Sequence, residues 1–335
     1  MPDHPRLSLL DLVRVREGRS ATDALAEAQE TAALVDRLGF TRYWVAEHHN
    51  MEGIASAATS VVLAHAGQKT SQIRLGAGGV MLPNHSPYII AEQFGTLARL
   101  FPGRVDLGLG RAPGTDQATL RAIRTTPDRA QAFPEDVLEL MHWFEPAGEP
   151  GYIRAWPAPG AEVAFWMLGS SNFGAMLAAE LGLPYAFASH FAPDYLHEAL
   201  HLYRSRFKPS KHLAAPYTAV GVHAICAPTE AEAKRLFTTT QMSFCGILRN
   251  DRRLSPPPIP DIEDYWTPRE KAQVERMLSC AVVGDPGQVR DGLARIAAET
   301  QADELIMLTD IYEVEARRRS LDLTAEVWGL EPRSF

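Results

Sequence analysis

Three stretches between residues 40 and 111 decide the fold: Ala46-Glu47-His48-His49, Gly76-Ala77-Gly78-Gly79-Val80-Met81-Leu82-Pro83 and Gly103-Arg104-Val105-Asp106-Leu107-Gly108-Leu109-Gly110-Arg111. In each of them a run of apolar residues ends in glycine, histidine or a charged residue. In parallel α/β proteins, ligands bind at the carboxyl ends of the strands, where such residues gather. The three stretches therefore indicate an enzyme.

Short apolar runs alternate with amphipathic segments along the whole chain. Strands are predicted at residues 7–13, 41–46, 73–81, 104–109, 163–168, 184–188, 217–227 and 303–308. Helices are predicted at residues 22–38, 55–66, 87–100, 127–144, 173–181, 194–207 and 313–328, and another begins at residue 229. Apolar strands that alternate with helices favour a parallel sheet covered on both faces. Eight of them predict an α/β protein with a closed (β/α)8 TIM barrel, formed as a single domain by residues 1–335.

Two segments interrupt this alternation. Residues 146–160 are rich in proline and glycine and predict an irregular insertion before the fifth strand. A longer insertion is predicted after the seventh strand, at residues 242–277, and it contains Ser255-Pro256-Pro257-Pro258-Ile259-Pro260. Proline lacks an N–H donor and disrupts helices, so we expect a long loop here. Long loops are often functional, which predicts a lid over the barrel mouth, with an inert surface loop as the alternative.

Composition excludes several classes of protein. The net charge is −8, and Arg317–Arg319 is the one prominent basic run, so neither nucleic acid nor an anionic membrane is an expected partner. Cys226, Cys245 and Cys280 are far apart and form no CxxC pair, which argues against a disulfide scaffold and a zinc ribbon. Residues 1–16 lack the apolar core of a signal peptide, and no apolar stretch is long enough to span a bilayer. A cytoplasmic protein is expected.

His48 and His49 are adjacent at the end of a predicted strand. Successive side chains of a strand point to opposite faces, so both can reach one metal ion only if the backbone bends. Metallohydrolase barrels generally use a His-x-His pair, which is absent here, and we therefore expect no metal. One histidine is expected at the barrel mouth and the other packed outward, bonded to Glu47. A histidine at the mouth suits proton transfer near neutral pH, and a buried, hydrogen-bonded pair is the alternative.

Gly78 and Gly79 lie inside a predicted strand, where glycine costs stability and packs against nothing. Glycine in such a position usually permits the close approach of a flat ligand or of another backbone. We favour a planar ligand against this strand, and the alternative is a β-bulge or tight packing.

Two segments carry groups that suit a phosphate. Arg111 follows the fourth strand and precedes Ala112-Pro113-Gly114, so a guanidinium is expected at the mouth. Ser170 and Ser171 join the fifth strand to its helix, where a hydroxyl, backbone N–H groups and the helix dipole together favour an anion. A surface salt bridge for Arg111 and an ordinary N-cap for the serines are the alternatives.

Taken together and in this order, these stretches resemble the bacterial luciferase-like monooxygenases, which are flavin-dependent oxidoreductases built on a (β/α)8 barrel. The resemblance is to the short, single-gene members of the family and covers most of the chain. It is strongest over residues 7–192 and 282–328. In the second region, Val283-Gly284-Asp285-Pro286 and Ala302-Asp303-Glu304-Leu305 match a habitual ending of the family.

The resemblance implies roles for single residues. His48 matches the active-site histidine of the family and would transfer a proton near the flavin. Gly78-Gly79 falls where the family has a non-prolyl cis peptide under the isoalloxazine ring. Arg111 and Ser170 match ligands of the FMN phosphate, to which Ser171 would add its backbone N–H.

Two positions depart from the family pattern. Gly110 stands where luciferases carry a reactive cysteine, which argues against luciferase-like aldehyde chemistry. Phe173 stands where a phosphate-binding threonine is expected. This second departure implies a looser grip on the phosphate, consistent with a flavin that arrives reduced and leaves oxidised.

The implied function is that of a two-component monooxygenase. Reduced FMN from a separate NAD(P)H-dependent flavin reductase would react with dioxygen and oxygenate a small organic substrate. A deazaflavin-dependent dehydrogenase on the same barrel and a non-catalytic flavin-binding protein are the alternatives. Trp44, Phe187 and Phe191 near strand ends suggest an apolar substrate, with packing in the core as the alternative. His190 is a further candidate for the pocket. The family habit implies a homodimer.

Overall fold

The computed structural model describes residues 4–112, 116–146, 153–251 and 253–334. Its strands are β1 (Arg6–Asp11), β2 (Arg42–Val45), β3 (Arg74–Met81), β4 (Val105–Gly110), β5 (Val163–Gly169), β6 (Tyr185–Phe187), β7 (Thr218–Cys226), β8 (Val282–Gly284) and β9 (Glu304–Leu308). Its α-helices are α1 (Ala21–Arg37), α2 (Thr59–Gly67), α3 (Pro87–Leu100), α4 (Gln117–Ala122), α5 (Phe133–Trp143), α6 (Asn172–Leu181), α7 (Leu196–Arg206), α8 (Glu230–Leu248), α9 (Pro268–Met277), α10 (Pro286–Thr300) and α11 (Val314–Trp328). Short 3-10 helices occur at η1 (Leu82–Asn84), η2 (Pro127–Gln131) and η3 (Ile262–Asp264).

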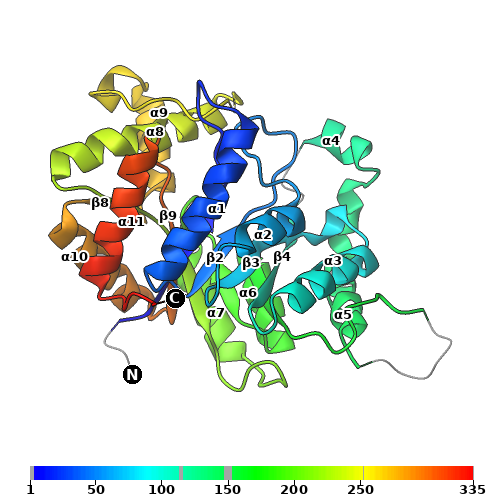
Figure 1. Cartoon of the computed structure of the whole chain (residues 1–335). Helices are drawn as coiled ribbons and strands as arrows, with labels where there is room; N and C mark the ends of the chain where they lie inside the picture. Colours follow the sequence, from blue (N-terminus) through cyan, green and yellow to red (C-terminus); the bar gives the residue numbers. More distant parts are fainter. Residues whose placement is uncertain (1–3, 113–115, 147–152, 252, 335) are drawn as a thin grey trace.

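Eight parallel strands form a closed barrel, as the sequence predicts. The strand order is β6-β5-β4-β3-β2-β1-β9-β7, and a further pairing of β6 with β7 closes the ring. The helices surround this ring, and α1 and α11 lie side by side on its outside (Figure 1). One further strand, β8, lies outside the ring and pairs with the carboxyl end of β7. It was not predicted from the sequence. Because the barrel strands are parallel, their carboxyl ends meet at one mouth.

The region before β5 differs from the prediction in one way. The helix predicted at residues 127–144 is divided into η2 and α5. Pro134 stands in the first turn of α5 and has no N–H to continue a helix from η2, which explains the division. Residues 147–152 of the predicted insertion lie outside the described residues, and residues 153–160 contain neither helix nor strand.

The prediction of one long loop at residues 242–277 is wrong at both ends. The first residues of this segment complete α8, and its last ten residues form α9, which a capping box between Thr267 and Glu270 starts. A small apolar core keeps the two helices together. It contains Phe244 of α8, Val274 of α9 and Trp266, which precedes α9. Between the two helices, the described residues contain the short helix η3 but no α-helix or strand. In this stretch Ser255 forms a β-bridge with Arg16. Arg16 follows the carboxyl end of β1, so the bridge lies on the side of the barrel mouth. A lid function for this segment stays a prediction.

The amino-terminal half of the barrel interior contains buried charges. The Arg42 guanidinium lies 3.0 Å from Oε1 of Glu304 and 2.7 Å from Oδ2 of Asp106. All three side chains are buried. A buried charge is tolerated only when it is paired, so this network ties β2, β4 and β9 together across the barrel.

No helix in the described part of the chain combines the length and the apolar character that crossing a membrane requires.

Candidate active site

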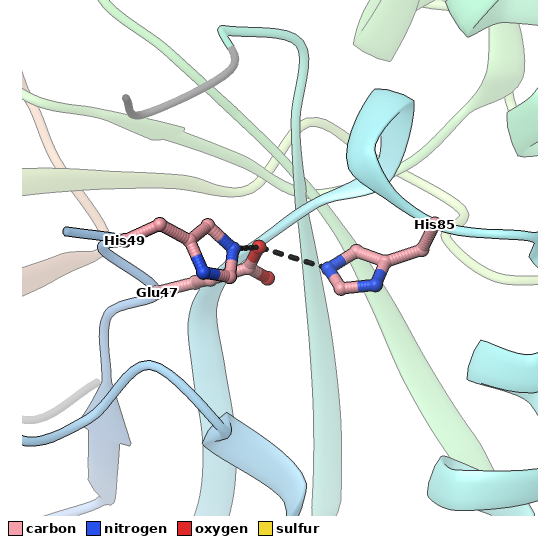
Figure 2. A group of neighbouring side chains, drawn as sticks. All are labelled: Glu47, His49 and His85. Atoms are coloured by element: carbon pink, nitrogen blue, oxygen red, sulfur yellow. Dashed lines mark hydrogen bonds and ion pairs between the residues drawn. The ribbon is translucent and has the colours of Figure 1, made fainter. Parts of the chain in front are cut away.

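The carboxyl ends of β2 and β3 bring a carboxylate between two imidazoles (Figure 2). Oε1 of Glu47 lies 2.6 Å from Nε2 of His49 and 2.8 Å from Nε2 of His85. The backbone N–H of Met81 donates to Oε2 of Glu47 at 3.1 Å. The predicted bond between Glu47 and one of the adjacent histidines is therefore confirmed, and His49 makes it.

The partners of Glu47 keep it ionised although it is buried. Burial opposes ionisation, but the hydrogen bonds from His49 and His85 outweigh it and lower the pKa of Glu47 to about 2. The bond to Glu47 in turn raises the pKa of His49. This cluster was missed from the sequence because His85 lies 38 positions from Glu47. The Glu47-x-His49 spacing, which places both side chains on one side of an extended backbone, was the available signal.

The peptide bond between Gly78 and Gly79 is cis, which confirms what the family resemblance implies. The packing around these glycines is tight. A Cβ on Gly78 would lie 2.7 Å from Cε3 of Trp44, and a Cβ on Gly79 would lie 2.4 Å from Cδ1 of Leu168. The alternative stated for these glycines, tight packing, is thus observed. The planar ligand stays a prediction.

Arg111 and the start of α6 lie against each other. The Arg111 guanidinium stacks over the Phe173 ring at 4.0 Å from its centroid. Ser171 is the N-cap of α6, and its side chain makes no capping hydrogen bond within the described residues. The stacking therefore places a cation beside the positive end of a helix dipole, with Ser170 and Ser171 in the connecting turn. The turn predicted after Arg111, at residues 113–115, lies outside the described residues.

His48 and His190 follow β2 and β6, and His223 lies within β7 beside the last residue of β9, so the three histidines gather near the mouth. The rings of His190 and His223 are 6.0 Å apart, and His190 also contacts Phe191. Gly221 makes room for this arrangement, since a Cβ there would lie 2.3 Å from Nδ1 of His190. Burial, then the proximity of His223 and of His48, lowers the pKa of His190 well below its usual value. His190 is thus a neutral group close to His48.

His223 is expected to make the protein less stable in acid. It is 2% exposed, neither ring nitrogen has a hydrogen-bond partner among the described residues, and burial, followed by nearby Arg14, lowers its pKa to about 3. Below about pH 6.5 the unfolded chain therefore binds a proton that the folded chain does not bind until about pH 3. The free energy of unfolding should fall by about 1.4 kcal/mol per pH unit through this window from His223 alone.

The His223→Phe variant should lose that contribution, and urea unfolding between pH 6 and 4 would measure it. The slope of unfolding free energy against pH should be smaller in the variant than in the wild type. Equal slopes would show that His223 is not held neutral in the folded protein.

Two of the residues suggested for the substrate pocket lie in the core. Trp44 is 1% exposed, and its indole N–H donates to Oδ2 of Asp106 inside the barrel. Phe187 is equally buried. Trp44 packs with Trp166 and Ile306 in the filled interior of the barrel, whereas Phe187 belongs to the core between the strands and the surrounding helices. Phe191 is exposed and, together with His190, lies at the mouth.

A surface cavity of about 420 Å³ lies elsewhere, on the outside of the barrel between α7 and the end of α10. Its lining includes His201, Arg204 and Glu299. None of the residues predicted for the site lines it.

Comparison with known proteins identifies the family. The family described as luciferase-like monooxygenase matches residues 6–304. A protein named luciferase-like monooxygenase from Escherichia coli strain K12 is 49% identical over 321 residues, which cover 96% of both chains. The crystal structure of apo-MsnO8 is 36% identical, with a TM-score of 0.90 over 98% of this chain and 99% of that one.

Two more distant structures share the fold. The oxygenating constituent of 3,6-diketocamphane monooxygenase from Pseudomonas putida, in complex with FMN, is 18% identical with a TM-score of 0.70, covering 96% of this chain and 97% of that one. An F420-dependent secondary alcohol dehydrogenase is 17% identical with a TM-score of 0.69, covering 97% and 98%. The match over nearly the whole chain and the 49% identity show that this chain belongs to the luciferase-like monooxygenase family.

Proposed function

We propose that this protein is the oxygenating component of a two-component monooxygenase that uses reduced FMN and dioxygen. The observation that carries the proposal is the position of Arg111, stacked on Phe173 at the start of α6 next to Ser170 and Ser171. A guanidinium, hydroxyls and helix N–H groups form a donor set that suits a phosphate monoester. The residues present therefore fit the phosphate of FMN.

Bound reduced FMN would supply the electrons and the reaction with dioxygen, as flavins do. The chain's own residues have other tasks. Arg111, Ser170 and Ser171 hold the phosphate. The backbone at Gly78-Gly79 supports the ring, where the family resemblance places the flavin. His48 holds or moves a proton at the mouth, and the apolar side chain of Phe191 favours an apolar organic substrate. A separate flavin reductase would deliver the reduced cofactor.

A deazaflavin-dependent dehydrogenase is the second candidate, since a structure on the same fold is F420-dependent. The phosphate of that cofactor could use the same Arg111 and serines. FMN is favoured because the family is described as luciferase-like monooxygenase and because a relative that is 49% identical carries that name. Anaerobic titrations with reduced FMN and with the deazaflavin compare the two candidates directly, and tighter binding of the deazaflavin would overturn the FMN proposal.

The Arg111→Ala variant is expected to bind reduced FMN about 10- to 150-fold more weakly. A hydrogen bond to a charged group contributes about 1.5–3 kcal/mol, which corresponds to this range. Quenching of protein fluorescence in anaerobic titrations measures the affinity. Arg319→Ala, which removes an exposed guanidinium from the outer helix α11, is the matched control and should bind like the wild type. Equal affinity of both variants would remove Arg111 from the phosphate site.

A further inference from the structure

The cluster at the ends of β2 and β3 has the geometry of a metal-binding group. One carboxylate oxygen of Glu47 and the Nε2 atoms of His49 and His85 lie within 4.8 Å of one another. Figure 2 shows the two imidazole rings on either side of the carboxylate, each with a nitrogen turned toward it. The ligand atoms thus converge from two neighbouring strand ends.

We propose that Glu47, His49 and His85 bind one divalent transition-metal ion of the Zn²⁺ type. Imidazole nitrogen and carboxylate oxygen are the donors that Zn²⁺ takes in sites with three protein ligands and one open position. This departs from the expectation of no metal, which considered only His48-His49 and His-x-His pairs. The pair that matters is Glu47 and His49, which are two residues apart and point to the same side.

The surroundings of Glu47 favour a cation. The carboxylate is 1% exposed, and within the described residues its ion pairs are with His49 and His85 alone, without lysine or arginine. Buried carboxylates are normally paired with a cation or bound to a metal. The Met81 N–H fixes Oε2, which leaves Oε1 directed at the two rings. Outer hydrogen bonds of this kind orient metal ligands.

An ion can reach this position. The side chains of His49 and His85 are 18% and 28% exposed, so both rings border solvent. The present separations of 2.6 and 2.8 Å are those of hydrogen bonds. Ligand atoms around tetrahedral Zn²⁺ are about 3.3 Å apart, given bonds of about 2.0–2.1 Å. The distance from Oε1 of Glu47 to each Nε2 atom therefore has to grow by roughly half an ångström to make room for the ion. Rotation of the two partly exposed imidazole rings can provide this change.

Equilibrium dialysis against Zn²⁺ alone tests the proposal. Untagged protein is stripped with a chelator, dialysed without flavin or phosphate, and its bound zinc is measured by atomic emission. We expect one Zn²⁺ per chain in the wild type. We expect at least about tenfold weaker binding in His85→Ala and in Glu47→Gln, which keeps the shape of the side chain without its charge. Zinc should also raise the melting temperature of the wild type and not that of His85→Ala.

A second histidine pair provides the control. His197 and His201 are four residues apart on the exposed face of α7 and lie outside the proposed site. His201→Ala should keep the wild-type stoichiometry and affinity. Far-ultraviolet circular dichroism establishes that each variant is folded, and His49→Ala replaces His85→Ala if the latter is not. Absence of stoichiometric zinc binding by the wild type, or unchanged binding by a folded His85→Ala, would overturn the proposal. Neither outcome bears on FMN, because no flavin is present.

Discussion

The His48→Ala variant is expected to turn over about 10²–10⁴-fold more slowly than the wild type, which is the range of general acid–base catalysis. His48 follows β2 at the mouth and lies close to His190. Its neighbour in the sequence, Glu47, is held by hydrogen bonds to His49 and His85. The family resemblance implies that His48 is the active-site histidine, and this role is part of the proposal. The affinity of the variant for reduced FMN should change little, because the proposal assigns the phosphate to Arg111, Ser170 and Ser171. Substrate oxygenation in single turnovers with reduced FMN and air measures the effect.

The matched control for His48 is His142→Ala, an exposed histidine on the outer helix α5. That variant should keep wild-type turnover. Rates for His48→Ala within about threefold of the wild type would exclude the proton-transfer role. If neither protein oxygenated any substrate and both bound FMN, a non-catalytic flavin-binding protein would be the better description.

The Arg42→Met variant is expected to lose about 3–5 kcal/mol of unfolding free energy. Methionine can fill much of the arginine volume, but it leaves Glu304 buried without its cation, while Asp106 keeps its ion pair with Arg74. An unpaired buried charge costs several kcal/mol, whereas the volume change costs less. Urea unfolding at neutral pH, followed by circular dichroism, measures the loss.

The ion pair between Lys208 and Glu180 is the matched control for Arg42, because both of its side chains are exposed. Lys208→Met should cost about 0–1 kcal/mol, as solvent screens an exposed pair. A loss below about 1 kcal/mol for Arg42→Met would mean that the Glu304 carboxylate is solvated or protonated once the guanidinium is gone. The network would then not hold β2, β4 and β9 together.

The barrel could be predicted because its signal is local and repeated. Each barrel strand is an apolar run between polar helices, and eight such runs specify the architecture. The helix predicted at residues 87–100 has the bounds of α3, because Pro87 starts it and its apolar residues recur at helical spacing. These features depend on residues close together in the sequence.

The region after α8 was the least predictable. β8 has three residues and pairs only with the far end of β7, so no strand pattern marks it. α10 was also missed, although Asp285 and Gln288 form a capping box that the sequence displays. The proline run at residues 256–260 led to the prediction of a long loop. The helices on either side persist because Phe244, Trp266 and Val274 bury each other.

Local features of the candidate site could be predicted where a motif carries them, whereas contacts created by tertiary packing were missed. The cis peptide at Gly78-Gly79 agrees with the family resemblance. His85 meets Glu47 only through the pairing of β2 with β3, and His190 meets His223 only because Gly221 leaves space. Trp44 was placed near the pocket from its strand position, but the interior of a closed barrel buries such side chains.

A crystal structure of the protein with FMN tests the central claim most directly. The proposal predicts the phosphate against the Arg111 guanidinium and the turn of Ser170 and Ser171, with the ring at the Gly78-Gly79 backbone and within reach of His48. A mouth filled by side chains, with Arg111 directed into solvent and FMN bound elsewhere or not at all, would contradict it.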